Sequence, residues 1–215
     1  MQTRTLRLGG PTSSQSRALC AVAPAGCPPL PVMTPFLTVV TPTFRRPSQL
    51  LACMASVQAQ TIAGEIQHVI EADYVGIGVA GMFARLASRP PAVYGQYVTC
   101  LGDDDVLAAP DAVEQLKRLA ATADWPDVIV VSTEKGHHGR LPYDVSGPPN
   151  AGRIDWNCIV TRRDVWAAHV HDFTAEYEAD HRHAKAMWDA GRTFHYATDL
   201  LLSRGLVSGG RPERR

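Results

Sequence analysis

Three consecutive aspartates, Asp103, Asp104 and Asp105, follow a short run of β-forming residues that ends at Gly102. Carboxylates are the ligands that hard divalent cations such as Mg²⁺ and Mn²⁺ prefer. In open α/β sheets, ligands bind at the carboxyl ends of the strands. A simple turn is the alternative, because Asp and Gly are common turn residues. The choice between a metal site and a turn depends on the elements around the triplet.

A fourth carboxylate, Asp180, lies on a helix predicted over residues 175–190, with Thr174 as N-cap and Glu176 in the first turn. One stripe of this helix carries Tyr177, Asp180, Ala184, Met187, Trp188 and Gly191. An acid on a core-facing stripe is costly unless it is paired. Asp180 must therefore meet a substrate, a metal or an arginine, and the arginines nearest in sequence are Arg162 and Arg163.

The elements that would position these acids alternate between strands and helices. Apolar runs predict strands at 36–40, 66–70, 97–101 and 128–131. Helices are predicted from Pro47 and over 111–121, and further strands at 154–160 and 193–196, separated by a short helix after 164. This order predicts one α/β domain with a mostly parallel central sheet flanked by helices. The polar stretch 132–152 is interpreted as a mobile flap.

The two ends of the chain differ from this pattern. Residues 1–34 contain arginines, Ser, Thr and Pro but no acid, so we expect a disordered or non-native extension, with translation starting at Met33 as one explanation. A transit peptide is the alternative. The folded domain is expected over 35–205 and a flexible tail over 206–215.

Composition excludes several classes of protein. The formal net charge is zero, so no basic field indicates nucleic acid or an anionic membrane as partner. The five cysteines are scattered and odd in number, which favours reduced thiols in a cytoplasmic protein over structural zinc or disulfides. Apolar runs are too short for a transmembrane span.

Two weaker signals remain. Residues 76–81, GIGVAG, satisfy the pattern GxGxxG. They follow the second predicted strand at a distance, whereas a dinucleotide fingerprint follows the first strand directly. The histidines form no catalytic triad with an elbow such as GxSxG. His195, on the last predicted strand, is kept as a candidate metal ligand, although a packed or exposed histidine is the commoner case.

Three stretches resemble family 2 glycosyltransferases, which are inverting enzymes of the GT-A fold. FLTVVTPTFRRPSQLLACMASVQAQT is similar to the family's first strand, its PT(Y/F)xR loop and a helix ending in SVxxQT. GQYVTCLGDDDVLAAP resembles the segment around the DxD motif, and DFTAEYEADHRHAKAMWDAG resembles the helix that carries the catalytic base. The three occur in the family's order and cover about residues 36–200.

The resemblance implies a role for each matching residue. Thr41, Pro42, Thr43, Phe44 and Arg45 would line the nucleotide pocket, and Glu71 or Asp73 would contact the nucleotide base. Gly102 stands where the family has its first acid, so Asp105 and then Asp103 would hold Mn²⁺ or Mg²⁺, with Asp103 and Asp104 facing the donor. Asp180 matches the general base. These donor, metal and catalytic residues are those to locate in the structure.

The resemblance therefore implies transfer of a sugar from a nucleotide-diphosphate sugar to an acceptor hydroxyl, with inversion. The donor sugar and the acceptor do not follow from these residues. A nucleotidyltransferase with a similar sheet is the enzymatic alternative, and pyrophosphate release would identify it. A catalytically inactive module that binds sugar nucleotides is the non-enzymatic one, because Gly102 and the segment 71–74 depart from the family's pattern.

Overall fold

The structure is a computed structural model that describes residues 34–89, 92–136, 139–142, 147–173 and 178–206. Apart from Thr34 and Leu206, the extension 1–34 and the tail 206–215 lie outside the described residues, as do Thr174, Glu176 and Tyr177. Leu206 donates its backbone N–H to the carbonyl of Asp104 at 2.8 Å.

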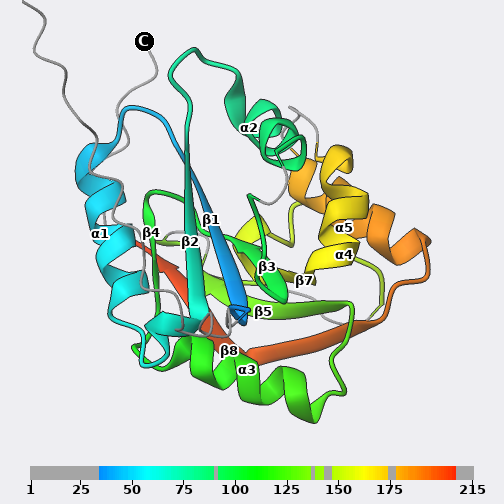
Figure 1. Ribbon diagram of the computed structural model, residues 1–215. Helices are drawn as coiled ribbons and strands as arrows, with labels where there is room; N and C mark the ends of the chain where they lie inside the picture. The colour runs from blue at the N-terminus through cyan, green and yellow to red at the C-terminus, as the bar shows by residue number, and fades with distance from the viewer. Residues whose placement is uncertain (1–33, 90–91, 137–138, 143–146, 174–177, 207–215) are drawn as a thin grey trace, which may run out of the picture. The chain divides into compact units, whose positions relative to one another are not determined.

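The described strands form one sheet in the order β2-β1-β3-β7-β5-β8-β4, with β6 paired to β5 (Figure 1). Direct pairings show that β1 is parallel to β2 and β3, and that β5 is parallel to β8. β7 lies antiparallel between β3 and β5, so these two point the same way. The parallel strands are β1 (Leu37–Thr43), β2 (Ile66–Ala72), β3 (Tyr97–Cys100), β5 (Val128–Glu134) and β8 (Phe194–Gly205). The antiparallel ones are β4 (Asp105–Leu107), β6 (Arg140–Leu141) and β7 (Ile159–Arg162).

Helices cover both faces of this sheet. On one face, α1 (Pro47–Gln58) and α3 (Ala112–Thr122) pack through Val57 and Leu116 against buried strand residues such as Leu37 and Ile129. The other face is covered by α2 (Gly78–Ala87), α4 (Arg163–His169) and α5 (Ala179–Asp189). The predicted α/β fold with a mostly parallel sheet flanked by helices is thus confirmed (Figure 1).

The boundaries differ from prediction mainly where polar residues are buried. β5 continues to Glu134 into the predicted flap, because Ser132 donates to the carbonyl of Thr198 and Thr133 shares a 2.7 Å hydrogen bond with Ser203. β8 is correspondingly longer than the predicted 193–196. The predicted strand 154–160 is instead a 3₁₀ turn, η3 (Trp156–Cys158), followed by β7. Helix α2 and strand β4 were not predicted.

The described residues all belong to one compact unit, which begins at Met33. Among them, no helix combines the length and apolar character that a membrane span requires. Three of the cysteines, Cys53, Cys100 and Cys158, are described and are free thiols.

Candidate active site

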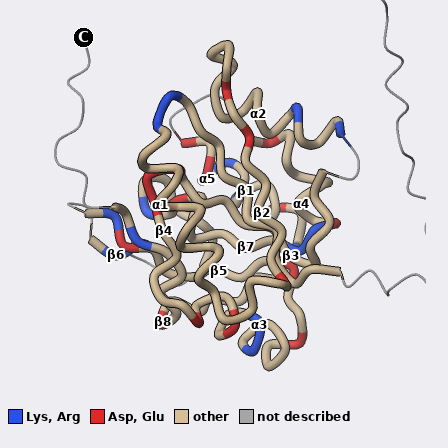
Figure 2. The backbone as a smooth tube through the Cα atoms, turned by 60° about the vertical axis from the view of Figure 1, so that its left-hand side comes forward, with Lys and Arg blue, Asp and Glu red and all other residues tan. Residues whose placement is uncertain are grey.

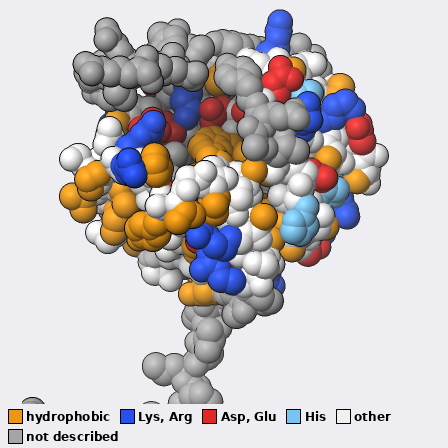
Figure 3. Space-filling view, turned by 90° about the horizontal axis from the view of Figure 1, so that it is seen from above, with side chains coloured by type: hydrophobic (Ala, Val, Ile, Leu, Met, Phe, Trp, Pro, Cys, Tyr) orange, Lys and Arg blue, Asp and Glu red, His pale blue; other side chains and the backbone are white. Residues whose placement is uncertain are grey.

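A cleft of about 280 Å³ opens at the edge of the sheet where β1, β2 and β3 end. Because parallel strands end at one edge, loops that are distant in sequence meet there. Acidic and basic side chains lie together in a hollow of this end of the molecule, bordered by apolar side chains (Figure 3). The cleft is lined by Pro42, Thr43, Phe44, Arg46, Asp73, Gly78, Val79, Met82, Gly102, Asp103, Asp104 and Trp156.

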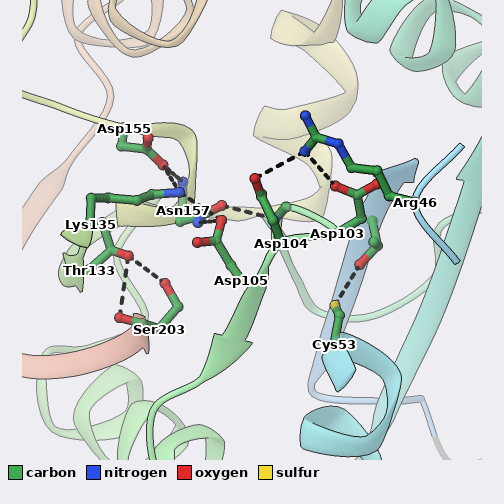
Figure 4. Close-up of polar contacts among 12 residues, drawn as sticks. Arg46, Cys53, Asp103, Asp104, Asp105, Thr133, Lys135, Asp155, Asn157 and Ser203 are labelled. Atoms are coloured by element: carbon green, nitrogen blue, oxygen red, sulfur yellow. Dashed lines mark hydrogen bonds and ion pairs between the residues drawn. The ribbon is translucent and has the colours of Figure 1, made fainter. Parts of the chain in front are cut away.

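Asp103 and Asp104 face this cleft and share one cation. Asp103 accepts a hydrogen bond from the Thr43 hydroxyl at 2.8 Å. The Arg46 Nη1 atom lies 3.2 Å from Asp103 Oδ1 and 3.0 Å from Asp104 Oδ2, so one guanidinium bridges both carboxylates (Figure 4). The Asp104 and Arg46 side chains are about half exposed, at 50% and 48%. The position between the two acids is therefore suited to a cation and open to solvent.

Asp105 has a different environment. It begins β4 and its side chain is almost fully buried. Its Oδ2 atom accepts hydrogen bonds from Lys135 Nζ and Asn157 Nδ2, each at 2.6 Å (Figure 4). Burial raises the pKa of this carboxyl, and the Lys135 ammonium opposes that rise. Asp105, which was expected to be the first metal ligand, is not part of the cleft lining. Its carboxylate is bound by Lys135 instead.

The same packing explains Gly102, which stands where the resemblance leads one to expect an acid. A Cβ atom at this position would lie 2.6 Å from Asp105 Oδ2. The Gly102 N–H also donates to Asn157 Oδ1 at 3.3 Å. A side chain is thus excluded at residue 102 by the buried Asp105–Asn157 pair.

Of the five residues expected in the nucleotide pocket, Pro42 and Thr43 at the end of β1 and Phe44 directly after it line the cleft. Thr41 instead lies inside the sheet, where its hydroxyl contacts Cys53 Sγ at 3.6 Å and His68 Nε2 at 2.9 Å. Arg45 adopts the left-handed conformation at φ 56° and places its guanidinium over the Phe44 ring, 4.9 Å from the centroid.

The two acids at the end of β2 are both held by the protein itself. Glu71 is buried and pairs with Arg85 at 2.5 Å and Arg89 at 2.8 Å. Asp73 lines the cleft and accepts backbone N–H groups from residues 75–78, at 2.6–3.2 Å. Burial would raise the Asp73 pKa, but these four donors lower it below its ordinary value. Of the two alternatives for the nucleotide-base contact, the structure therefore places only Asp73 in the cleft.

This loop also accounts for the GxGxxG match. Gly76 and Gly78 have positive φ angles of 81° and 71°, which let successive N–H groups converge on one point. That point is occupied by the Asp73 carboxylate. The anion that this loop holds is thus part of the chain, not a dinucleotide pyrophosphate.

Asp180 lies in the first turn of α5, partly buried. Burial raises its pKa to about 6, and the negative charge of Asp155 adds to this rise against a 2.7 Å hydrogen bond from its neighbour's N–H. The two arginines considered as partners bind elsewhere, since Arg162 pairs with Asp127 and Asp164 and Arg163 donates to the carbonyl of Tyr94. Asp180 is therefore a carboxylate with the raised pKa that suits a general base.

His195 is not brought to the aspartates. In the register of the sheet it pairs with Ile129, whereas Asp105 pairs with Gly205 at the opposite end of β8. The stretch from 195 to 205 corresponds to roughly 30 Å of extended strand. His195 is consequently not part of the metal site considered below.

Four residues of this region were not identified from the sequence: Arg46, Lys135, Trp156 and Asn157. Arg46 is adjacent in sequence to Arg45, which was predicted. Its partners, Asp103 and Asp104, follow β3, and only the pairing of β1 with β3 brings them close to it. Lys135 and Asn157 come from segments read as flap and strand. Two polar residues, Asp155 and Asn157, within an otherwise apolar predicted strand were the available signal.

The chemistry of a divalent cation fits Asp103 and Asp104. Such ions bind through one or two carboxylates together with substrate phosphates, and a cationic group already bridges this pair. Among the residues that the structure describes, no group of three or more His, Cys, Asp or Glu side chains is arranged to hold a metal ion. A metal here would thus depend on phosphate oxygens for its remaining ligands.

Comparison with known proteins gives a fold but no family. No family model matches the sequence, and no curated protein is similar to it. Among solved structures, the chain is similar to S. aureus TarS (residues 1–349), with a TM-score of 0.52 and 14% identity over 79% of this chain and 60% of that one. A TarS structure in complex with UDP-GlcNAc gives a TM-score of 0.51, with 12% identity, 81% and 59% coverage.

The mannosyltransferase PcManGT from Pyrobaculum calidifontis, in complex with GDP-Man and Mn²⁺, gives a TM-score of 0.57 at 13% identity over 83% of this chain and 59% of that one. The chain thus spans about three fifths of the length of these structures. At such identities the likeness concerns the fold alone, and both neighbours are GT-A glycosyltransferases. The described part of this chain has the GT-A glycosyltransferase fold.

Proposed function

We propose that this protein is an inverting, metal-dependent glycosyltransferase of family 2, which moves a sugar from a nucleotide-diphosphate sugar to an acceptor hydroxyl. The observation that carries the proposal is the cleft at the carboxyl edge of a GT-A sheet, whose lining includes two carboxylates and the arginine side chain that bridges them. Two of the solved structures described above hold a sugar nucleotide, UDP-GlcNAc in one and GDP-Man with Mn²⁺ in the other.

In this proposal, the nucleotide side of the cleft is lined by Thr43, Phe44 and Asp73. Phe44 is 45% exposed and offers its ring to the nucleotide. Asp103 and Asp104 would hold Mn²⁺ or Mg²⁺, which when bound supplies positive charge to the leaving diphosphate. The metal would take the place of the Arg46 guanidinium, which bridges the two acids in this structure, and Arg46 would then pair with the donor's phosphates. The donor is thus met by cations at its phosphates and by an aromatic ring beyond them.

Asp180 acts as the general base. The acceptor oxygen forms a bond to the anomeric carbon while the bond from that carbon to the diphosphate oxygen breaks on the opposite side. The acceptor proton passes to the Asp180 carboxylate, and the electron pair leaves with the nucleoside diphosphate, so the anomeric centre inverts. A base with a pKa near 6 is ionised at neutral pH and still accepts a proton as the acceptor attacks.

Turnover of UDP-GlcNAc and GDP-Man with a panel of acceptors, in Mn²⁺ or Mg²⁺, tests this function by release of UDP or GDP. EDTA should abolish release. Asp180→Asn should lower kcat by about 100-fold or more while donor binding is kept. Asp189→Asn is the matched control, because Asp189 lies on the same helix in an exposed pair with Lys185.

Other outcomes of these experiments would refute a part of the proposal or identify a different function. Wild-type turnover by Asp180→Asn would refute the base, and full activity in EDTA would refute the metal. Pyrophosphate release from a nucleoside triphosphate would identify a nucleotidyltransferase instead. Donor binding without any turnover would identify an inactive binding module.

A further inference from the structure

A second pocket, of about 350 Å³, lies at the opposite edge of the sheet from the cleft. It forms where β3 begins and β7 ends, and Tyr97 pairs there with Arg162. Six positions along the chain separate Tyr97 from Asp103, which corresponds to roughly 15–20 Å. The pocket is lined by Gln96, Tyr97, Trp125, Arg162, Arg163 and Asp164, and charged residues mark the junction of β7 with α4 beside β3 (Figure 2).

Trp125 forms the apolar wall of this pocket and is held in a costly conformation. Asp124 and Trp125 have φ angles of 56° and 55°, in the left-handed region that bulky residues rarely adopt. A backbone hydrogen bond from Trp125 to the carbonyl of Ala120, at 2.8 Å, fixes the turn after α3. The indole ring stacks on Tyr97 with centroids 6.4 Å apart, yet 41% of Trp125 remains exposed.

Tyr97 makes this wall rigid. It is almost completely buried and packs against Phe36 at 5.7 Å between centroids. Its hydroxyl donates to the carbonyl of Pro126 at 2.8 Å, so the ring behind Trp125 is fixed by both packing and a hydrogen bond. An exposed aromatic ring with such support presents a flat apolar surface at little entropic cost.

The polar side of the pocket is neutral in charge. Arg162 pairs with Asp127 at 2.7 Å and with Asp164 at 2.7 Å and 2.9 Å. Arg163 donates to the carbonyl of Tyr94 at 3.0 Å. Counting Asp127, which pairs with Arg162 but is not among the lining residues, two arginines stand against two aspartates, so the group offers donors and acceptors without a net charge. An anionic ligand would find no excess of positive charge here.

We propose that this pocket binds a neutral saccharide, with one sugar face against Trp125 and its hydroxyls against the Arg163 and Asp164 side chains. A sugar ring combines an apolar face with a rim of hydroxyl donors and acceptors, which matches a flat indole beside fixed charged groups of both signs. The site goes beyond the proposed transfer reaction, because neither the donor nor the base uses any of its residues. It would hold a glycan away from the point of transfer.

Titration of the full chain with maltohexaose, cellohexaose and mannohexaose, without nucleotide or metal, tests this site. Indole N–H signals are followed by NMR, and Trp125→Phe assigns the signal of residue 125. At least one oligosaccharide should shift that signal, and Trp125→Ala should weaken its binding about tenfold or more. Tyr74→Ala should not, because Tyr74 is an exposed aromatic residue that does not line this pocket.

Arg163→Ala gives a second variant in case Trp125→Ala does not fold, and it should also weaken binding severalfold. The proposal is overturned if no oligosaccharide shifts the Trp125 signal, or if both variants bind as the wild type does. A pocket that accepts a protein segment gives the first of these results. Because donor and metal are left out, failure here leaves the cleft assignment intact, and loss of transferase activity leaves this site intact.

Discussion

The three aspartates of the triplet are adjacent in sequence but lie in two different environments. Asp103 and Asp104 face a cleft and share the half-exposed Arg46, whereas Asp105 is buried between Lys135 and Asn157 (Figure 4). Asp103 is itself buried, but Arg46 and Asp104 are about half exposed, so solvent screens their side of the first group and lets its cation exchange. The second group is held in place by the cost of leaving a buried charge without its partner.

This difference suggests two separate roles, cation binding by Asp103 and Asp104 and support of the turn by Asp105, which the sequence alone could not assign. Asp103 and Asp104, which line the cleft, can exchange the guanidinium for another cation, as binding of a metal–diphosphate complex requires. The buried Asp105 fixes the turn that carries the pair, through Asn157 and the contact that makes residue 102 a glycine. The resemblance placed Asp105 first among the metal ligands; in this structure its carboxylate is bound by Lys135 and Asn157 and lies outside the cleft lining.

Replacement of the buried acid should have the largest effect. Asp105→Asn leaves the Lys135 ammonium without its 2.6 Å partner, so the free energy of unfolding should fall by about 3 kcal/mol. Asp104→Asn, the same change at the adjacent and half-exposed position, should cost less than about 1 kcal/mol. Urea denaturation of both variants measures the difference.

Equal losses at the two positions would show that Asp105 and Asp104 do not differ in this way. Lys135→Met provides a further check, because it removes the ammonium and leaves the buried carboxylate. It should be as destabilising as Asp105→Asn, and the double variant should lose less than the sum of the two. Additive losses would mean that the two side chains do not act as a pair.

The surroundings that set the carboxyl pKa differ between Asp105 and the proposed base, Asp180, and the pH dependence of the reaction tests this difference. Burial acts on both carboxyls, but Asp105 has an ammonium beside it, whereas Asp180 has the like charge of Asp155. With a pKa of about 6, Asp180 becomes protonated below that pH. The kcat should then fall about tenfold for each further pH unit.

Stability should change in the opposite direction. The folded pKa of Asp180 exceeds the unfolded value of about 3.9, so the folded state binds this proton more tightly. The contribution of Asp180 to stability therefore rises as pH falls from about 6 to about 4. Asp180→Asn should remove this dependence from thermal melts recorded across that range. A kcat that is constant down to pH 5 would exclude Asp180 as the titrating base.

Much of the fold followed from patterns in the sequence. Apolar runs bounded by turn residues located β1, β2, β3 and the start of β5, and helical spacing located α1, α3 and α5. The patterns failed where polar side chains are satisfied inside the sheet: Ser132 donates to the carbonyl of Thr198, and Thr133 shares a hydrogen bond with Ser203. Such residues read as loop, because their hydrogen-bond partners lie about seventy positions away in sequence.

The site was predictable to the level of loops but not of individual side chains. The chain after β1 and the triplet after β3 were expected at one edge because both follow parallel strands. Which acid faces the cleft depends on the turn from Gly102 to Asp105 and on Lys135 and Asn157, contacts that no local pattern encodes. Thr41 was misplaced for a similar reason, since α1 covers it through Cys53.

The smallest predicted effect concerns Arg46, which competes for the carboxylates that we assign to the metal. Arg46→Met keeps much of the apolar stem and removes the guanidinium that bridges Asp103 and Asp104. The Arg46–Asp104 contact is about half exposed, and a pair of this kind is worth about 0.2–1 kcal/mol, so Mn²⁺ alone should bind up to about fivefold more tightly. Calorimetric titration with MnCl₂ measures this gain, with Arg118→Met as control because Arg118 pairs with Glu114 on α3. Weaker binding of Mn²⁺ to Arg46→Met than to the control would show that the guanidinium supports the metal site. It would refute the hypothesis that the metal replaces the guanidinium bound by Asp103 and Asp104.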